Sequence, residues 1–354
     1  MTGAAFAWSA LAAGCSVLAL VAATFVIGAL TGRHSVMDVA WGASIAVAAV
    51  ASFLTSAGHG APARRWLLLA TAFTWGYRLA WHIATRARGA GEDPRYRELL
   101  DRAPGSRNWY ALRVVYLPQL LILWIACLPL PAGMTQQAAP GAVTAIGGIA
   151  WLTGFVFETA GDWQLARFRA DPANRGRIMD RGLWRYTRHP NYFGDACMWW
   201  GLFLIAYGSP WQLLTVVSPL LMTFILTRGT GQRMTERRMS GDRPGYADYV
   251  ARTSGFIPLP PRHRLLREIN GHRYPAQRVT KTATTTTMRM TRAAVSPMAA
   301  SLPRFAPVSA TFPAAPGWAS SSACALSYDS LTTRIPAAVS GSNTSGGKSR
   351  STRG

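Results

Sequence analysis

The sequence predicts an all-α membrane protein: a bundle of about seven transmembrane helices followed by a disordered C-terminal tail. Three observations lead to this prediction. Apolar runs long enough to cross a bilayer, which takes roughly 20 residues each, recur along the first 230 residues. The connections between these runs alternate between arginine-rich and uncharged segments. Residues 262–354 contain two acids, many Ser, Thr, Ala and Pro, and no sustained apolar period, which is typical of a disordered segment.

The apolar runs define the expected spans. They occupy residues 7–30, 37–57, 65–85, 112–130, 141–161, 193–207 and 211–227. No Lys or Arg precedes the first run, and it is longer than the apolar region of a signal peptide, so we interpret it as a span. Pro118 and Pro129 should kink or shorten the fourth span. The Gly-rich start of the fifth favours close helix packing.

The charge pattern of the connections predicts a topology. Arginines are concentrated in three places, residues 86–111, 162–191 and the segment after 227, whereas the loops 131–140 and 208–210 carry no charge. By the positive-inside rule, the N-terminus lies outside and the C-terminus in the cytoplasm. Arg64 and Arg65 lie on the wrong side in this scheme. The arginine-rich segments then face one compartment and can build one site.

Other classes of function find little support. The formal charge of +22 would suit nucleic-acid binding, but several membrane-length apolar runs argue against that role. The four cysteines form no CxxC pair and no cluster with histidine, so we expect no bound metal and no disulfide framework. His34 and His82 likewise lack paired ligand spacing.

The most polar stretch joins the fifth and sixth spans. Between Asp162 and Trp200 it contains seven arginines and four carboxylates. Pro190 is suited to the first position of a helix, whose free N–H groups, with Arg188 beside them, would bind an anion. Asn191 and Asp195 share a helix face, as do Asp162 and Arg169. This lining suits a nucleotide cofactor; the alternative is a loop whose arginines bind lipid head groups.

Two motifs within this stretch, GLWRYTRHPNYFGD and the preceding DWQLARFRADP, closely resemble the C-terminal half of the membrane steroid 5-alpha-reductase superfamily. The nearest match is its bacterial domain-of-unknown-function branch, DUF1295. The resemblance extends to SVMDVAWG at 35–42, YRLAWHIATRARGAGEDPRY at 77–96 and RPGYADYVARTSGFIPLPPR at 243–262. It therefore covers nearly all of residues 30–262 and none of the tail. Isoprenylcysteine carboxyl methyltransferases share a similar RHPxYxG.

The resemblance implies an NADPH-dependent enzyme that reduces a carbon–carbon double bond conjugated to a ketone. Three groups of cofactor-binding residues in these enzymes match positions of this sequence. Asp162 and Arg169 match the first group; Asn191, Tyr192, Gly194 and Asp195 match the second; Arg228, with Tyr246 or Tyr249, matches the third. Asp195 stands where the steroid enzymes have Glu, and Met198 where they have a second acid. Arg188 and His189 match the methyltransferase version of the motif better.

The resemblance also implies a tyrosine and an acid that hold the substrate ketone. Tyr77 matches the tyrosine, and Asp38 is the acid available near an early span. Adding hydride to the β-carbon builds an enolate oxygen, which a phenol can stabilise by donating a hydrogen bond while the acid orients the phenol. The alternative for Tyr77 is an anchor at the membrane interface.

Three functions follow from these observations. The first is an NADPH-dependent reductase of a lipid or steroid-like substrate, with a membrane domain at 1–261, its cofactor half at 141–261, and a tail at 262–354. The second is an S-adenosylmethionine-dependent methyltransferase of a membrane lipid or prenyl group. The third is a lipid-binding scaffold, in which Tyr77 and Asp38 could be changed without consequence. Because the resemblance is to bacterial proteins, we expect a bacterial cytoplasmic membrane.

Overall fold

The structure is a computed structural model that describes residues 2–229, 232, 236, 239 and 244–262. Within these residues the secondary structure is helical, apart from an isolated bridge between Thr187 and Ser254. The predicted all-α bundle is confirmed. The tail predicted for 262–354 lies outside the described residues, except for Arg262.

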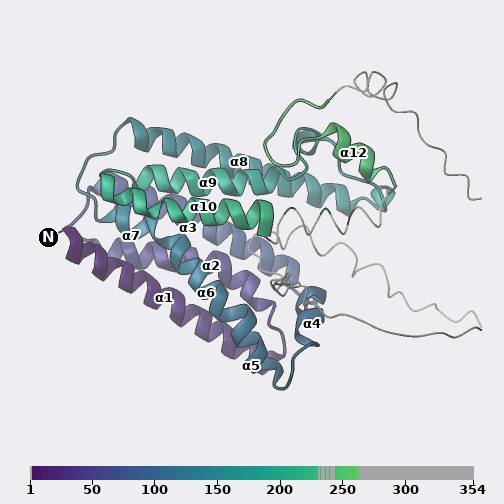
Figure 1. Cartoon of the computed structure of the whole chain (residues 1–354), viewed down its shortest axis with the longest axis horizontal. Coiled ribbons are helices and arrows are strands. Elements are labelled where there is room, and N and C mark those ends of the chain that lie inside the picture. Colours follow the sequence, from purple (N-terminus) through teal and green to yellow (C-terminus); the bar gives the residue numbers. More distant parts are fainter. Residues whose placement is uncertain (1, 230–231, 233–235, 237–238, 240–243, 263–354) are drawn as a thin grey trace, which may run out of the picture.

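Long helices form the body of the molecule (Figure 1). They are α1 (Thr2–Thr31), α2 (Val36–Thr55), α3 (Pro62–Ala87), α8 (Ala142–Ala170) and α9 (Pro190–Ala206). Two further rods are assembled from shorter pieces. The first comprises α5 (Arg107–Ala111), η1 (Leu112–Tyr116), α6 (Leu117–Cys127) and α7 (Pro129–Met134); the second comprises η4 (Pro210–Val216), α10 (Val217–Phe224) and η5 (Ile225–Gly229). The short elements α4 (Pro94–Leu100), η2 (Pro172–Asn174), η3 (Gly182–Arg185) and α12 (Tyr246–Arg252) lie outside these rods.

Five of these segments are long and apolar enough to cross a membrane. They are Gly3–Thr31, Val36–Thr55, Arg107–Met134, Ala142–Ala170 and Pro210–Arg228. The remaining expected spans correspond to α3 and α9. Helix α3 carries several arginines, and α9 has 17 residues, most of them buried. Both helices lie alongside the other rods, α3 against α2 and α9 against α8. The chain therefore runs back and forth through an antiparallel bundle, as Figure 1 shows.

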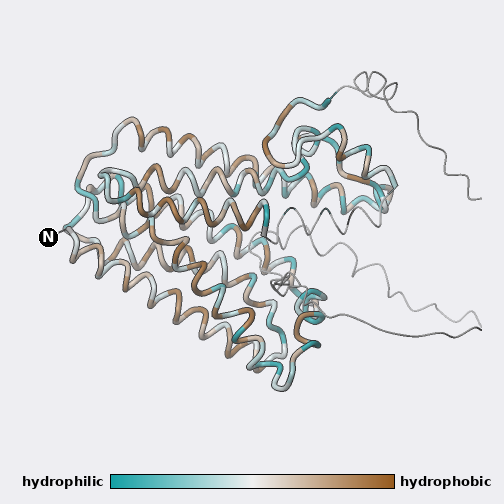
Figure 2. The backbone as a smooth tube through the Cα atoms, viewed as in Figure 1, coloured by the Kyte–Doolittle hydropathy of each residue, from teal (hydrophilic) through white to brown (hydrophobic). Residues whose placement is uncertain are grey.

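The two ends of the bundle differ in polarity (Figure 2). The hydrophilic connections gather at the end that holds α4 and α12, and the N-terminus lies at the opposite end (Figure 1). The arginine-rich segments thus share one end, as their alternation along the chain predicted. Which side of a membrane this end faces stays a prediction.

Arg64, which did not fit the expected topology, is a buried structural residue at the other end. Its guanidinium donates to the carbonyls of Tyr207 at 3.0 Å and Ala139 at 3.2 Å. Arg65 donates to Phe53 O at 2.6 Å and to Ser56 Oγ at 2.9 Å. Both side chains therefore satisfy backbone or hydroxyl oxygens at helix ends, where such groups lack helical partners.

Glycines allow close contact between α8 and α9. A Cβ atom added to Gly201 would lie 2.7 Å from Trp151 N, and one added to Gly194 would lie 2.5 Å from Glu158 N. Gly154 faces Gly194 in the same way. Because small residues let helix backbones approach, the close packing predicted for the Gly-rich start of the fifth span is confirmed at Gly147, where an added Cβ would lie 2.7 Å from Ile205 N. It brings the polar residues of the two helices together.

The fourth span is irregular, as its prolines predicted. Helix η1 is a π-helix that ends at Tyr116, two residues before Pro118, and Pro129 begins α7. Pro118 has no N–H to donate to the preceding turn, which disturbs the regular α-helical bonding there.

Candidate functional site

A cluster of polar side chains lies buried between α3, α8 and α9. Arg78 on α3 forms an ion pair with Glu158 on α8 and a longer one, 3.5 Å from Nη1 to Oδ2, with Asp162 one turn further on. Trp75 Nε1 donates to Glu158 Oε2 at 2.9 Å. Asn191 Nδ2, from the first turn of α9, donates to Asp162 Oδ1 at 3.3 Å. We call these five residues, together with Asp195, the central cluster.

The central cluster contains more acids than cations. Glu158 and Asp195 are 1% and 0% exposed, and Asp162 and Asn191 are also buried. Asp195 lies close enough to Glu158 to interact with it electrostatically. Ionisable groups inside a membrane bundle are costly to bury, so they usually mark a site. This grouping is the strongest candidate in the described part of the chain.

Helix α3 extends the polar surface from the central cluster toward the arginine-rich end. Arg78, His82 and Arg86 are spaced four residues apart, so they lie along one face of the helix. His82 interacts electrostatically with Asp162, and Arg86 with Asp93 in the connection before α4. This row of side chains therefore links the central cluster to a second group of charges.

The second group surrounds Asp38 at the start of α2. Tyr96 Oη donates to Asp38 Oδ1 at 2.7 Å, and Arg95 Nη2 lies 3.0 Å from Asp38 Oδ2. Arg95 Nε also donates to Asp93 Oδ1 at 2.9 Å. Burial, followed by the negative charge of Asp38, raises the pKa of Tyr96 well above its ordinary value, so the phenol keeps its proton. Burial opposes ionisation of Asp93, but the hydrogen bonds and charge of Arg95 lower the pKa of that carboxyl.

The structure does not bring Tyr77 and Asp38 together. The Tyr77 side chain is 57% exposed and its ring stacks on Phe73 and Trp81, with centroids 6.2 Å apart in each case. That is the environment of an outward-facing aromatic on a membrane helix. Asp38 has Tyr96 as its phenol instead. The ketone-holding role assigned to Tyr77 and Asp38 stays a prediction.

Arg188 and His189 point toward Glu236 in the C-terminal segment. Arg188 Nε and His189 Nε2 lie 2.9 Å and 3.2 Å from the same Glu236 oxygen. Arg188 also donates to the carbonyls of Thr253 at 2.6 Å and Val250 at 3.2 Å. Arg188 is therefore already occupied by protein acceptors, which weighs against the anion site predicted beside Pro190.

The protonation of this trio follows from its surroundings. Burial lowers the pKa of His189, which keeps its ring neutral. Burial also opposes ionisation of Glu236, but hydrogen bonds from His189 and Arg188 lower the pKa of Glu236 to about 2. We attribute the ionised state of Glu236 to the permanent positive charge of Arg188. Tyr192 stacks on His189 with ring centroids 5.0 Å apart.

The two C-terminal tyrosines are buried in the same region. Tyr249 Oη donates to Trp184 O at 2.6 Å, and Tyr246 lies beside it with ring centroids 6.1 Å apart. Backbone bonds from Arg188 N to Ser254 O and from Leu259 N to Tyr186 O join the C-terminal segment to the arginine-rich loop. The segments that the sequence assigned to one site are thus joined.

The remaining predicted cofactor residues are less enclosed. Arg169 is half-buried two turns beyond Asp162 on α8, and Arg228 is exposed in η5.

Sequence reasoning missed Glu158 as a member of the site. Its signal was a single acid inside an otherwise apolar run, four residues before Asp162 and so on the same helix face. Among the described residues, no group of three or more His, Cys, Asp and Glu side chains is arranged to hold a metal ion.

Comparison with known proteins gives a single result. The model of a family described as "Protein of unknown function (DUF1295)" matches residues 24–253. No curated protein and no solved structure matches the chain. The matched region contains every member of the central cluster and the second group around Asp38. Because the match extends over more than half of its length, the chain belongs to the DUF1295 family.

Proposed function

We propose that this protein is a membrane-embedded NADPH-dependent oxidoreductase that reduces a carbon–carbon double bond conjugated to a carbonyl. The substrate that we propose is a lipid or a steroid-like molecule. The proposal combines the family resemblance with the chemistry of the central cluster, because fold-level kinship does not by itself establish an activity.

One observation carries the proposal. The hydrogen bond from Asn191 to Asp162 joins two residues that the resemblance assigns to cofactor binding and that come from different helices. The contact is buried, and it depends on the close approach of α8 and α9 at Gly154 and Gly194. Two helices can pack against each other without carboxylates. The buried carboxylates at this contact therefore favour a ligand-binding site.

The residues present fit the chemistry of a dinucleotide. The carboxylate and amide oxygens of Asp162, Asn191 and Asp195 would bind hydroxyl or amide groups of the cofactor, and Arg169, nearer the polar end, would pair with a phosphate. Bound NADPH would supply the hydride. Arg78 would hold Glu158 and Asp162 in place through its two ion pairs, while the apolar helices around them exclude water.

A second candidate function rests on the excess of acids in the central cluster. The sulfonium group of S-adenosylmethionine is a cation, and Glu158, Asp162 and Asp195 would attract it. The Arg188-His189 pair also matches the methyltransferase version of the motif. A membrane lipid or prenyl methyltransferase is therefore the alternative to the reductase.

The substrate carbonyl needs a hydrogen-bond donor. In the Asp38–Tyr96 pair the single phenolic proton already goes to Asp38, so this pair joins α2 to α4 and has no proton free for a substrate in the observed arrangement. The outward-facing Tyr77 could reach a substrate only from the lipid side of α3. Comparing Tyr77→Phe with Tyr96→Phe in a turnover assay separates the two tyrosines.

Ligand binding tests the proposed function. The full chain is purified in detergent, and its thermal unfolding is followed with NADPH, NADH and S-adenosylmethionine. We expect NADPH to raise the unfolding temperature. In Asn191→Ala, loss of a buried hydrogen bond of about 1–3 kcal/mol should weaken NADPH binding roughly five- to 150-fold.

A matched pair of glutamate variants provides the control. Glu158→Gln removes a charge from the central cluster, whereas Glu98→Gln removes one from an exposed ion pair with Arg102. Weaker NADPH binding in Glu158→Gln alone supports the proposal. Stabilisation by S-adenosylmethionine alone would replace the reductase with the methyltransferase. If none of the compounds shifts the unfolding temperature, the enzymatic proposals fail and the lipid-binding scaffold is preferred.

A further inference from the structure

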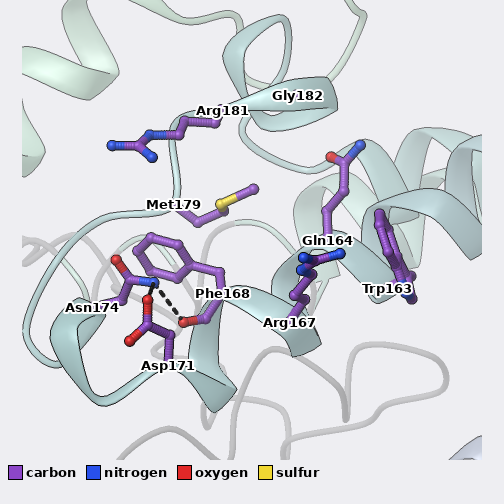
Figure 3. A pocket seen from close by; sticks show the side chains of 9 residues that line it. All are labelled: Trp163, Gln164, Arg167, Phe168, Asp171, Asn174, Met179, Arg181 and Gly182. Carbon is purple, nitrogen blue, oxygen red and sulfur yellow. Dashed lines mark hydrogen bonds between the residues drawn. The ribbon is translucent and has the colours of Figure 1, made fainter.

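A separate cavity of about 560 Å³ lies on the outer side of α8, where the helix meets the arginine-rich loop. Figure 3 shows the side chains that line it. They are Trp163, Gln164, Arg167, Phe168, Asp171, Asn174, Met179, Arg181 and Gly182. None of them belongs to the central cluster. Asp162 points inward to Arg78 and Asn191, whereas the next residue, Trp163, is 59% exposed.

Hydrogen bonds fix the walls of this cavity. Asn174 Nδ2 donates to Phe168 O at 3.0 Å, which holds the loop after α8 against the end of the helix. Leu183 N donates to Gln164 Oε1 at 3.0 Å, which returns the loop to α8 one turn further back. Gly182 has a positive φ of 57° and lies against the Gln164 side chain. The loop therefore forms a closed turn around the cavity.

The cavity has two cations that are not balanced by acids. Arg167 and Arg181 form no ion pair with any carboxylate in the described part of the chain. The guanidinium of Arg167 lies over the Trp163 ring at 5.6 Å from its centroid. The lining acid, Asp171, already accepts from Ala173 N at 2.9 Å and from Asn174. The cavity thus favours an anion.

The position of the cavity along α8 indicates the source of this anion. Exposed apolar side chains at Ile149, Leu152 and Val156 lead along one helix face to Trp163 and then to Arg167. At 1.5 Å per residue, Trp163 lies about 32 Å from the start of α8. That length matches a hydrocarbon core of about 30 Å. Trp163 is therefore at interface depth, and Arg167 is one turn further, at the depth of lipid phosphates.

We propose that this cavity is a binding site for the head group of an anionic phospholipid. The phosphodiester would lie between Arg167 and Arg181, and the acyl chains would lie along the exposed face of α8. Two arginines suit phosphate because each presents several N–H donors in a fixed fork. The apolar stripe is what favours a lipid over a soluble phosphate compound.

Native mass spectrometry tests the proposal on the full chain in a neutral detergent. The added probes are dioleoyl phosphatidylglycerol, dioleoyl phosphatidylcholine and glycerol 3-phosphate. We compare wild type with Arg167→Gln/Arg181→Gln and with the control Arg97→Gln/Arg102→Gln, which removes two exposed arginines of the α4 region. At about 1 kcal/mol per arginine near an anionic surface, we expect roughly thirty-fold weaker phosphatidylglycerol binding in the cavity variant alone.

Each outcome bears on the site directly. Loss of phosphatidylglycerol adducts in the cavity variant, with wild-type unfolding temperature in the absence of lipid and unchanged adducts in the control, supports the proposal. Equal loss in both double variants would mean that binding follows overall charge, which overturns a specific site. Displacement of the lipid by glycerol 3-phosphate at similar concentration would overturn the lipid assignment. If the cavity variant unfolds early, Arg167→Lys/Arg181→Lys keeps both charges and should retain most of the binding.

Discussion

Substituting Gly194 by alanine should destabilise the protein and disrupt the central cluster together. The residue lies on α9 between Asn191 and Asp195, where the backbone of α8 is in direct contact. A Cβ at this position would be 2.5 Å from both Glu158 N and Gly154 O. These are backbone atoms, so no side chain can rotate away to make room.

The size of the effect follows from this geometry. Ordinary contact begins at 3.4 Å, so α9 must move away from α8 by about 0.9 Å. Asn191 Nδ2 and Asp162 Oδ1 are 3.3 Å apart, and a shift of that size breaks their hydrogen bond. Overpacking of this kind costs about 1–3 kcal/mol, against a gain of about 0.5–1 kcal/mol from replacing glycine in a helix. We expect a net loss of about 1–2 kcal/mol.

The control is the same substitution at Gly148, on α8. An added Cβ there has nothing within 4 Å, so Gly148→Ala should stabilise the protein by about 0.5–1 kcal/mol. Denaturant unfolding in detergent measures both variants, and NADPH titration measures the central cluster. The reasoning is refuted if Gly194→Ala is as stable as Gly148→Ala, or if it is destabilised but binds NADPH like wild type.

Three further predictions concern other polar contacts. Tyr96→Phe removes a hydrogen bond to the Asp38 carboxylate and should lower the free energy of unfolding by about 1.5–3 kcal/mol without changing NADPH affinity; an altered affinity would place Tyr96 in the ligand site. Arg64→Leu should cost about 1–3 kcal/mol in the same assay, because buried carbonyls lose their donor, and a neutral effect would contradict its structural role. The contribution of His189 to stability should fall as pH decreases below 6.5, because its pKa is lowered and the unfolded chain then binds the extra proton, and the contribution of Glu236 should fall from about 4.5 toward 2 as that carboxylate is protonated. Between pH 6.5 and 5, His189→Asn should lose less stability than wild type in a pH series of unfolding curves, and an identical loss in both would contradict the assignment.

The positions of the helices could be predicted from the sequence because each one depends mainly on local composition. A run of apolar residues in a bilayer forms a helix because its backbone N–H and C=O groups can find hydrogen-bond partners only within the segment. The break in the fourth span was also local, since Pro118 disturbs its own preceding turn. The expected boundary at 193 was three residues late because Pro190 and Asn191 begin α9 in spite of their polarity.

The pairing of side chains could be predicted only in part. The meeting of Asp162 and Asn191 was implied by two helices joined through one loop and by matching motifs. The Asp38–Tyr96 bond joins residues 58 positions apart, and it depends on how α4 folds back under α2. The resemblance assigned Tyr77 as the phenol beside Asp38, and only the fold shows that Tyr77 faces outward while Tyr96 donates to Asp38.

The two polar sites are separated by the width of one helix, and this explains why they can be tested independently. The inner face of α8 carries Glu158 and Asp162, and glycines bring that face into close contact with α9. The outer face carries Trp163 and Arg167 above an apolar stripe. A substitution at Arg167 changes the charge of the outer cavity. It should leave the α8–α9 contact unaltered, because no contact between Arg167 and the central cluster is found among the described residues. Ligand binding at the central cluster and lipid binding at the outer cavity should therefore respond to different variants.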